Sequence, residues 1–223
     1  MPFFNPLLTF CRRPVYYKQM NNMNSKPSQL HDAREKLLQV GLELIQKGGY
    51  GASSIKDVVT EAEVPKGSFY YYFDSKETFA KEVIERYAST ATSERTQLLA
   101  DRDIPPLIRL RRYFETYIQY FADARYKEGC LFGNLSLEMC DHSEVLRAPV
   151  VAGFQDWEQD LRAVLQEASE VRQIPAPFHV EMLAAFILNS WEGALVRMRA
   201  EQSVAPLQLF ITTVFDQMLQ AKV

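Results

Sequence analysis

The stretch Val64-Pro65-Lys66-Gly67-Ser68-Phe69-Tyr70-Tyr71-Tyr72-Phe73 sets a proline and a glycine at the start of an aromatic run. A little upstream lies Ser54-Ile55-Lys56-Asp57-Val58-Val59, in which Ser54 and Asp57 have the spacing of a capping box. A helix, a tight turn and a second short helix would account for both segments. That arrangement is a helix-turn-helix, whose second helix is of the kind that lies in the major groove of DNA.

Outward from this stretch, helical periodicity continues and no strand pattern occurs, so we predict an all-α fold. The main breaks are the glycine pair at 48–49 and the proline-containing segments 101–106 and 173–177. The expected helices cover 29–47, 54–63, 66–72, 76–99, 107–124, a short segment ending at 140, 143–171, 177–200 and 206–221. Residues 89–97 are polar, which predicts a solvent-exposed connector between two domains.

Three parts are expected along the chain. Residues 1–28 are apolar before they are basic, which is the opposite order from a secretory signal. They are either a flexible arm or an upstream extension, with Met20 or Met23 as the usual first residue. Residues 29–75 are expected to form the helix-turn-helix domain with three helices. Residues 76–223 are expected to form a larger helical domain for ligand binding and dimerisation.

Composition limits the classes of protein. The chain has 223 residues, of which 47% are hydrophobic, and a net charge of −3. Residues 30–80 hold 6 Lys or Arg against 8 Asp or Glu, so any DNA contact must come from a few placed cations. Three cysteines make no disulfide framework, which favours a reduced, cytoplasmic setting. No apolar run reaches about 18 residues, so we expect no membrane span.

The first residues of the predicted second helix of the helix-turn-helix carry the chemistry that DNA requires. Lys66 can reach a guanine or a phosphate, Ser68 can pair with several bases, and Gly67 allows close approach of the backbone. The Tyr71 hydroxyl suits a phosphate, and Lys76 lies at a helix amino terminus that favours one. The alternative is that residues 69–73 are an aromatic core and the lysines a solvated surface.

Residues 30–80 resemble the amino-terminal domain of TetR/AcrR-type transcriptional regulators. The matching segments are Ala33–Leu38, Gly48–Ala52, Ile55–Val58, Ala62–Phe73 and Ser75–Glu77. The resemblance implies an all-helical homodimer that represses by binding a palindromic duplex DNA operator and is released by a small-molecule inducer. The DNA contacts that it implies are Lys56, Lys66, Gly67, Ser68, Tyr70, Tyr71, Tyr72 and Lys76. The family often has histidine where this chain has Tyr72, so a phosphate donor remains there but the option of a positive charge does not.

The segment 129–144 begins Gly-Cys-Leu and continues with Glu138 and Cys140-Asp141. It is similar to a subgroup of TetR-type regulators that answer reactive electrophiles, such as N-ethylmaleimide, or small unsaturated acids. Cys130 follows a glycine at a predicted helix amino terminus, which would lower its thiol pKa and make it a redox or electrophile sensor. The alternative is that Cys130 and Cys140 are small buried hydrophobes. The spacing of Cys140 and His142 fits no zinc pattern, so no metal and no cofactor are expected.

Aromatic and polar side chains of the second half suggest a ligand pocket, although stripes of this kind are more often core. The ligand-binding candidates are Tyr117, Phe121, Phe132, Trp157, Asn189 and Trp191. The last two helices are the predicted dimer interface, forming a four-helix contact across a two-fold axis. The interface candidates are Phe186, Ile187, Leu195, Leu207, Phe210, Ile211, Val214, Phe215 and Met218.

Two other classes of protein compete with a DNA-binding regulator. An enzyme has no support, because the chain shows no nucleotide-binding loop, no nucleophile paired with a base and no catalytic carboxylate pair. A helical protein-interaction adaptor without DNA binding would explain the acidic second half. It would not explain Lys66-Gly67-Ser68 beside a run of tyrosines.

Overall fold

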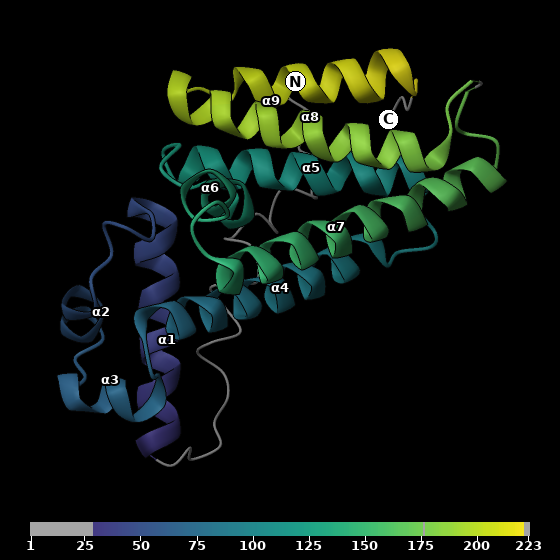
Figure 1. Ribbon diagram of the computed structural model, residues 1–223. Coiled ribbons are helices and arrows are strands. Elements are labelled where there is room, and N and C mark those ends of the chain that lie inside the picture. Colours follow the sequence, from purple (N-terminus) through teal and green to yellow (C-terminus); the bar gives the residue numbers. More distant parts are fainter. Residues whose placement is uncertain (1–28, 176, 221–223) are drawn as a thin grey trace, which may run out of the picture.

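The computed structural model describes residues 29–175 and 177–220, and the regular elements of that part are all helical (Figure 1). The predicted all-α class is therefore confirmed. The expected arm of residues 1–28 lies outside the described residues. The elements are α1 (Gln29–Gly48), α2 (Ile55–Glu61), α3 (Lys66–Tyr72), α4 (Lys76–Leu99), α5 (Pro106–Asp123), α6 (Leu131–Glu138), α7 (Glu144–Glu170), α8 (Val180–Glu201), α9 (Ala205–Ile211) and the π-helical η4 (Thr212–Met218).

Serine caps determine where several of these helices begin. The Ser54 hydroxyl accepts from the Asp57 amide, and the Asp57 carboxylate accepts from the Ser54 amide, which completes the predicted capping box. Ser75 and Ser143 accept from backbone amides in the first turns of α4 and α7. Helix boundaries in this chain therefore follow from short-range chemistry.

Helices α1, α2 and α3 pack as a small unit around aromatic rings. Phe69 of α3 and Phe73, the residue just after it, meet Phe79 of α4, with ring centroids 5.1 and 4.9 Å from that of Phe79. A Cβ at Gly41 of α1 would overlap the Phe79 ring, so glycine is needed there for close approach. Tyr70 and Tyr71 point outward and are exposed. The aromatic run thus divides into core phenylalanines and exposed tyrosines, so the alternative of an aromatic core holds for Phe69 and Phe73 but not for Tyr70 and Tyr71.

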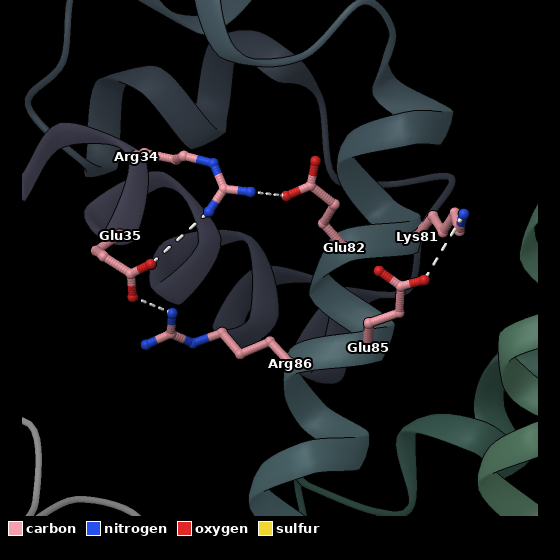
Figure 2. Close-up of polar contacts among 6 residues, drawn as sticks. All are labelled: Arg34, Glu35, Lys81, Glu82, Glu85 and Arg86. Carbon is pink, nitrogen blue, oxygen red and sulfur yellow. Dashed lines mark hydrogen bonds and ion pairs between the residues drawn. The ribbon is translucent and has the colours of Figure 1, made fainter. Parts of the chain in front are cut away.

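Ion pairs fix α1 against the first half of α4. Figure 2 shows Arg34 and Glu35 of α1 facing Glu82 and Arg86 of α4. Arg34 pairs with Glu82, and Arg86 pairs with Glu35. Arg34 and Glu35 also lie 3.8 Å apart, so the four groups form one network. A network of this kind resists sliding of α1 along α4 better than an isolated surface pair would.

The second half of α4 is part of the larger helical unit. In Figure 1 it runs beside α7, with α5, α8 and α9 beyond it. Within the predicted solvent-exposed connector at residues 89–97, residues 89, 93, 96 and 97 are exposed. The prediction is wrong for Arg95, which is only 2% exposed. Its Nε donates to Asp160 of α7 at 2.7 Å, and its guanidinium lies 5.8 Å from the Trp157 ring centroid. Arg95 is accommodated in the core, although the stretch around it is polar, because its charge is paired with that of Asp160.

Candidate DNA interface and effector cavity

Helix α3 presents a polar and aromatic surface away from the core. Lys66, Gly67, Tyr70 and Tyr71 are exposed, and Tyr71 reaches 72% exposure. A Cβ at Gly67 would meet no atom within 4 Å, so nothing inside the protein requires a glycine at this position. The sequence-predicted reading residues therefore lie together on one outer surface, where a major groove can reach them.

The other predicted DNA contacts are less uniform. Lys56 is exposed near the start of α2, whereas Ser68 and Tyr72 are half-buried. Lys76 has an internal partner, because its ammonium donates to the Tyr50 carbonyl at 2.6 Å and lies 4.1 Å from the Tyr50 ring centroid. Burial lowers the pKa of Lys76, although nearby Glu138 opposes that shift. A phosphate contact by Lys76 stays a prediction.

A cavity lies among α4, α5, α6, α7 and α8, with an empty volume of about 370 Å³ that includes space open to solvent. Five of the six predicted ligand residues line it, namely Tyr117, Phe121, Phe132, Trp157 and Trp191. Asn189 does not, because it is exposed on α8 two residues before Trp191 and so points to the opposite side of that helix. The inclusion of Asn189 in the pocket is therefore wrong.

Several cavity residues escaped the sequence prediction. Tyr87 and Arg95 come from α4, and Tyr113 comes from α5. The prediction treated residues 89–97 of this helix as a connector, and no pattern in a single sequence indicates which turn of a long helix faces a cavity. The Tyr117 hydroxyl donates to Glu94 at 3.0 Å, and Glu94 lines a second pocket that shares Tyr117 and Phe121 with this cavity.

The cavity contains one unused hydrogen-bond donor. Trp157 is 7% exposed, and its indole Nε1–H has no hydrogen-bond partner among the described residues. An unsatisfied buried donor costs about 1–3 kcal/mol. The indole N–H is therefore available to donate a hydrogen bond to an oxygen atom of a ligand in the cavity.

The predicted low pKa of Cys130 is wrong. Cys130 is 5% exposed, and burial raises the pKa of its thiol well above the usual range, with a further contribution from the Glu192 carboxylate. Cys130 does cap α6, but that helix has only eight residues, and desolvation of the thiolate outweighs its dipole. Burial also raises the pKa of Glu192 to about 7, partly opposed by the hydrogen bond that it receives from Cys130.

Helix α6 connects the cavity to the small unit. Cys130 and Phe132 at its beginning line the cavity, and Glu138 is its last residue. The Glu138 carboxylate accepts from the backbone amides of Tyr50 and Gly51 at 2.8 and 2.5 Å. Two charge-assisted hydrogen bonds therefore hold the loop between α1 and α2 against the end of α6.

The predicted dimer interface is mostly internal to the protomer. Seven of the nine candidates are buried within one chain, namely Ile187, Leu195, Leu207, Phe210, Ile211, Val214 and Phe215, and Met218 is half-buried. Only Phe186 is exposed, at 46%. The apolar side chains that α8 and α9 do expose are Met182, Phe186, Val196 and Leu209. The two predicted helices do carry exposed apolar side chains on their outer surface. The seven buried residues were chosen wrongly, because these helices turn their larger apolar face toward the core of the same protomer.

Two further properties concern the described residues only. Within 29–175 and 177–220, no group of three or more His, Cys, Asp or Glu side chains is placed to hold a metal ion. None of the helices described is long and apolar enough to cross a membrane.

Comparison with known proteins identifies the family. A model described as "Bacterial regulatory proteins, tetR family" matches residues 37–83, and "Tetracyclin repressor-like, C-terminal domain" matches residues 106–214. The HTH-type transcriptional repressor DhaR of Mycobacterium sp. (strain GP1) is 34% identical over 83% of this chain and 92% of its own length. The chain belongs to the TetR family. It is accordingly a DNA-binding transcriptional regulator of the repressor type, as its named relatives are.

Other TetR-family members are similar to this protein in sequence and structure over most of the chain. The repressor NemR of Escherichia coli (strain K12) is 30% identical over 80% of this chain and 89% of its own length. The structure of E. coli NemR in its reduced form superposes with a TM-score of 0.75 at 28% identity, covering 82% of this chain and 96% of that one. The crystal structure of a regulatory protein from Rhodobacter sphaeroides superposes with a TM-score of 0.78 at 31% identity, covering 81% of this chain and 96% of that one. These relatives are regulators and not enzymes, and they give no support to an adaptor without DNA binding.

Proposed function

We propose that this TetR-family protein is a homodimer that holds a palindromic duplex operator and releases it in response to an effector. The effector is either a small molecule in the cavity or a reagent that modifies Cys130. The protein would act in the cytoplasm, where bacterial DNA lies. Residues 29–75 would bind DNA, and residues 76–223 would bind the effector and the second protomer.

The DNA contacts that we propose centre on α3. Lys66, Gly67 and Tyr71 are exposed on one surface, and exposed Lys56 and Tyr70 extend it. The remaining proposed contacts are Ser68, Tyr72 and Lys76. Because the small unit carries no excess of positive charge, most of the affinity would depend on these few groups.

A second protomer would cover the exposed apolar side chains of α8 and α9. Figure 1 places these helices on the side of the molecule away from α2 and α3. A two-fold axis there would leave both α3 helices free to face DNA. Half-sites would then lie about one helical turn apart, roughly 34–36 Å.

The observation that carries the proposal of release is the path of α6. The helix begins at the cavity, with Cys130 and Phe132, and ends with Glu138 bound to the α1–α2 loop. An effector that displaces the beginning of α6 would move the loop and tilt the small unit, which changes the distance between the two α3 helices. Release needs only a difference in effector affinity between the two arrangements.

Operator binding by variants of α3 tests the DNA assignment. Lys66→Ala and Tyr71→Ala should each abolish binding to a duplex from the protein's own promoter, measured by fluorescence anisotropy. The dimer should persist, since both side chains are exposed. Lys127→Ala, which removes an exposed lysine far from α3 in the sequence, is the matched control and should bind normally. Unchanged binding by both α3 variants would show that α3 does not read DNA.

A further inference from the structure

The thiol of Cys130, a residue that lines the cavity, meets the carboxylate of Glu192. Glu192 comes from α8, and its carboxylate lies against the backbone of Gly133 in the first turn of α6. A Cβ at Gly133 would overlap Oε2 of Glu192 and would lie 3.8 Å from the Cβ of Cys130. Glycine at this position therefore admits the carboxylate, which receives a hydrogen bond from the Cys130 thiol. Oε1 of Glu192 is buried and has no hydrogen-bond partner within residues 29–175 and 177–220.

The same cavity supplies a donor for a ligand oxygen. Trp157 is more than nine-tenths buried and lines the cavity together with Cys130, and its indole N–H has no hydrogen-bond partner in the part of the chain that the structure describes. Cys130, just before α6, and Trp157 of α7 thus line one cavity, and the Glu192 carboxylate of α8 contacts the Cys130 thiol. This is a second observation, independent of the cysteine, that points to a bound molecule.

We propose that Glu192 accepts the Cys130 proton when the thiol adds to a small, uncharged α,β-unsaturated carbonyl compound, and that the Trp157 N–H binds the carbonyl oxygen. The inference rests on the proposed function, in which modification of Cys130 is one means of release. It goes further in naming the proton acceptor, the group that orients the reagent, and the class of reagent.

The step balances without an oxidant or a leaving group. The sulfur forms a bond to the β-carbon of the reagent as the S–H bond breaks and the proton passes to a carboxylate oxygen of Glu192. The π electrons of the carbon–carbon double bond move toward the carbonyl, giving an enolate whose oxygen accepts from the Trp157 N–H. Glu192 then returns the proton to the α-carbon, which restores the carboxylate and leaves a thioether on Cys130.

The environment of the thiol explains why a base is needed. Burial raises the pKa of Cys130, so little thiolate exists near neutral pH. A neighbouring carboxylate can remove the proton while the S–C bond forms, which avoids a free buried thiolate. Tyr87 of α4 interacts with both members of this pair and Tyr113 of α5 interacts with Cys130, and burial keeps both phenols neutral by raising their pKa.

The charges around the cavity select against an anionic reagent. Arg95 is the cation in the lining, and its charge is matched by Asp160. Glu94 in a neighbouring pocket and Glu192 beside Cys130 add negative charge when ionised. An uncharged enone or enal should therefore enter more readily than an unsaturated carboxylate of the same size.

Mass spectrometry of the full-length protein tests the inference, with methyl vinyl ketone as the probe and the rate constant for adduct formation at Cys130 as the readout. Glu192→Gln should lower that rate constant by about 10²-fold at neutral pH, in line with the loss of a general base. Glu192→Asp should restore part of it, and Trp157→Phe should lower it with a smaller effect. Glu201→Gln, an exposed change on the same helix, should have no effect.

A pH profile separates proton transfer from a merely structural role. The wild-type rate constant should rise as pH passes through about 7, where Glu192 becomes a carboxylate. The Glu192→Gln variant should lack that rise. Acrylate should react more slowly than methyl vinyl ketone in the wild type. Circular dichroism and equal alkylation after denaturation would establish that each variant is folded and carries an intact thiol.

The outcomes distinguish this inference from the proposed function. Equal rate constants in wild type and Glu192→Gln would overturn the role of Glu192 while leaving modification of Cys130 in place. An unreactive Cys130 in the wild type would overturn both this inference and release by cysteine modification. Modification that depends on Glu192 but does not release the operator would support the inference and refute that means of release.

Discussion

At the scale of single residues, Gly67 separates the demands of DNA binding from those of folding. Its surroundings leave room for a side chain, and its φ is not positive. Gly67→Ala should therefore raise the free energy of unfolding by up to about 1 kcal/mol, because alanine favours a helix over glycine. Operator affinity should fall, since a methyl group there would meet the DNA backbone.

Gly41 supplies the contrast for Gly67. Gly41→Ala places a methyl group against the Phe79 ring and should lower the free energy of unfolding by about 1–3 kcal/mol. Urea unfolding and anisotropy on the two variants check the pair. A destabilised Gly67→Ala variant would contradict the open space around Gly67. Normal DNA binding by that variant would show that the surface of α3 is not the reading surface described above.

Glu192 makes a second residue-scale prediction, on stability against pH. Its folded-state pKa is about 7, above the usual value of 4.5, so the folded protein keeps a proton that the unfolded chain loses. Stability should therefore fall as pH rises from about 4.5 to 7. Glu192→Gln should remove this loss, giving a gain of roughly 2–3 kcal/mol at pH 8 over that at pH 4. Thermal unfolding at both pH values measures it, and an equal effect at both would contradict the raised pKa.

At the scale of elements, α6 is short but connects two units. Glu138 is the contact through which it holds the α1–α2 loop. Glu138→Ala removes two charge-assisted hydrogen bonds and should lower stability by about 1–3 kcal/mol. Operator binding should become less sensitive to the effector, because movement of α6 no longer reaches the loop. A titration of effector against the preformed operator complex measures this sensitivity.

Two variants make the Glu138 experiment specific. Glu138→Gln keeps one acceptor oxygen and should be intermediate. Asp141→Asn removes a carboxylate from an exposed position just after α6 and should behave as wild type. An unaltered effector response in Glu138→Ala would mean that coupling runs through α4 and its ion pairs with α1 instead (Figure 2).

At the scale of the whole molecule, the exposed apolar side chains of α8 and α9 should hold the dimer together. Phe186→Glu would place a charge in that interface and should give a monomer by light scattering. Operator binding should be lost with it, because one protomer reaches one half-site. Val151→Glu is the matched control for Phe186→Glu, since Val151 of α7 is exposed to the same extent, 46%. A dimeric Phe186→Glu variant would move the interface to another surface.

The sequence by itself determined the helical class, most helix ends and the helix-turn-helix. These follow from periodicity, serine caps and glycine or proline breaks, which act over a few residues and can be read from neighbours in the chain. The same short-range signals placed Lys66 and Gly67 at the start of α3 and Tyr71 in its last turn. Five of the six proposed cavity residues were also found, because apolar residues at helical spacing must face an interior.

Only the tertiary structure decided which side of each helix faces that interior. Asn189 and the buried residues of α8 and α9 were assigned incorrectly, since periodicity identifies an apolar face but not the partner that covers it. Cys130 was given a low pKa from its place at a helix start, yet burial beside Glu192, distant in the sequence, reverses the shift. Contacts such as Glu138 with Tyr50 join residues far apart in the chain, and packing alone brings them together.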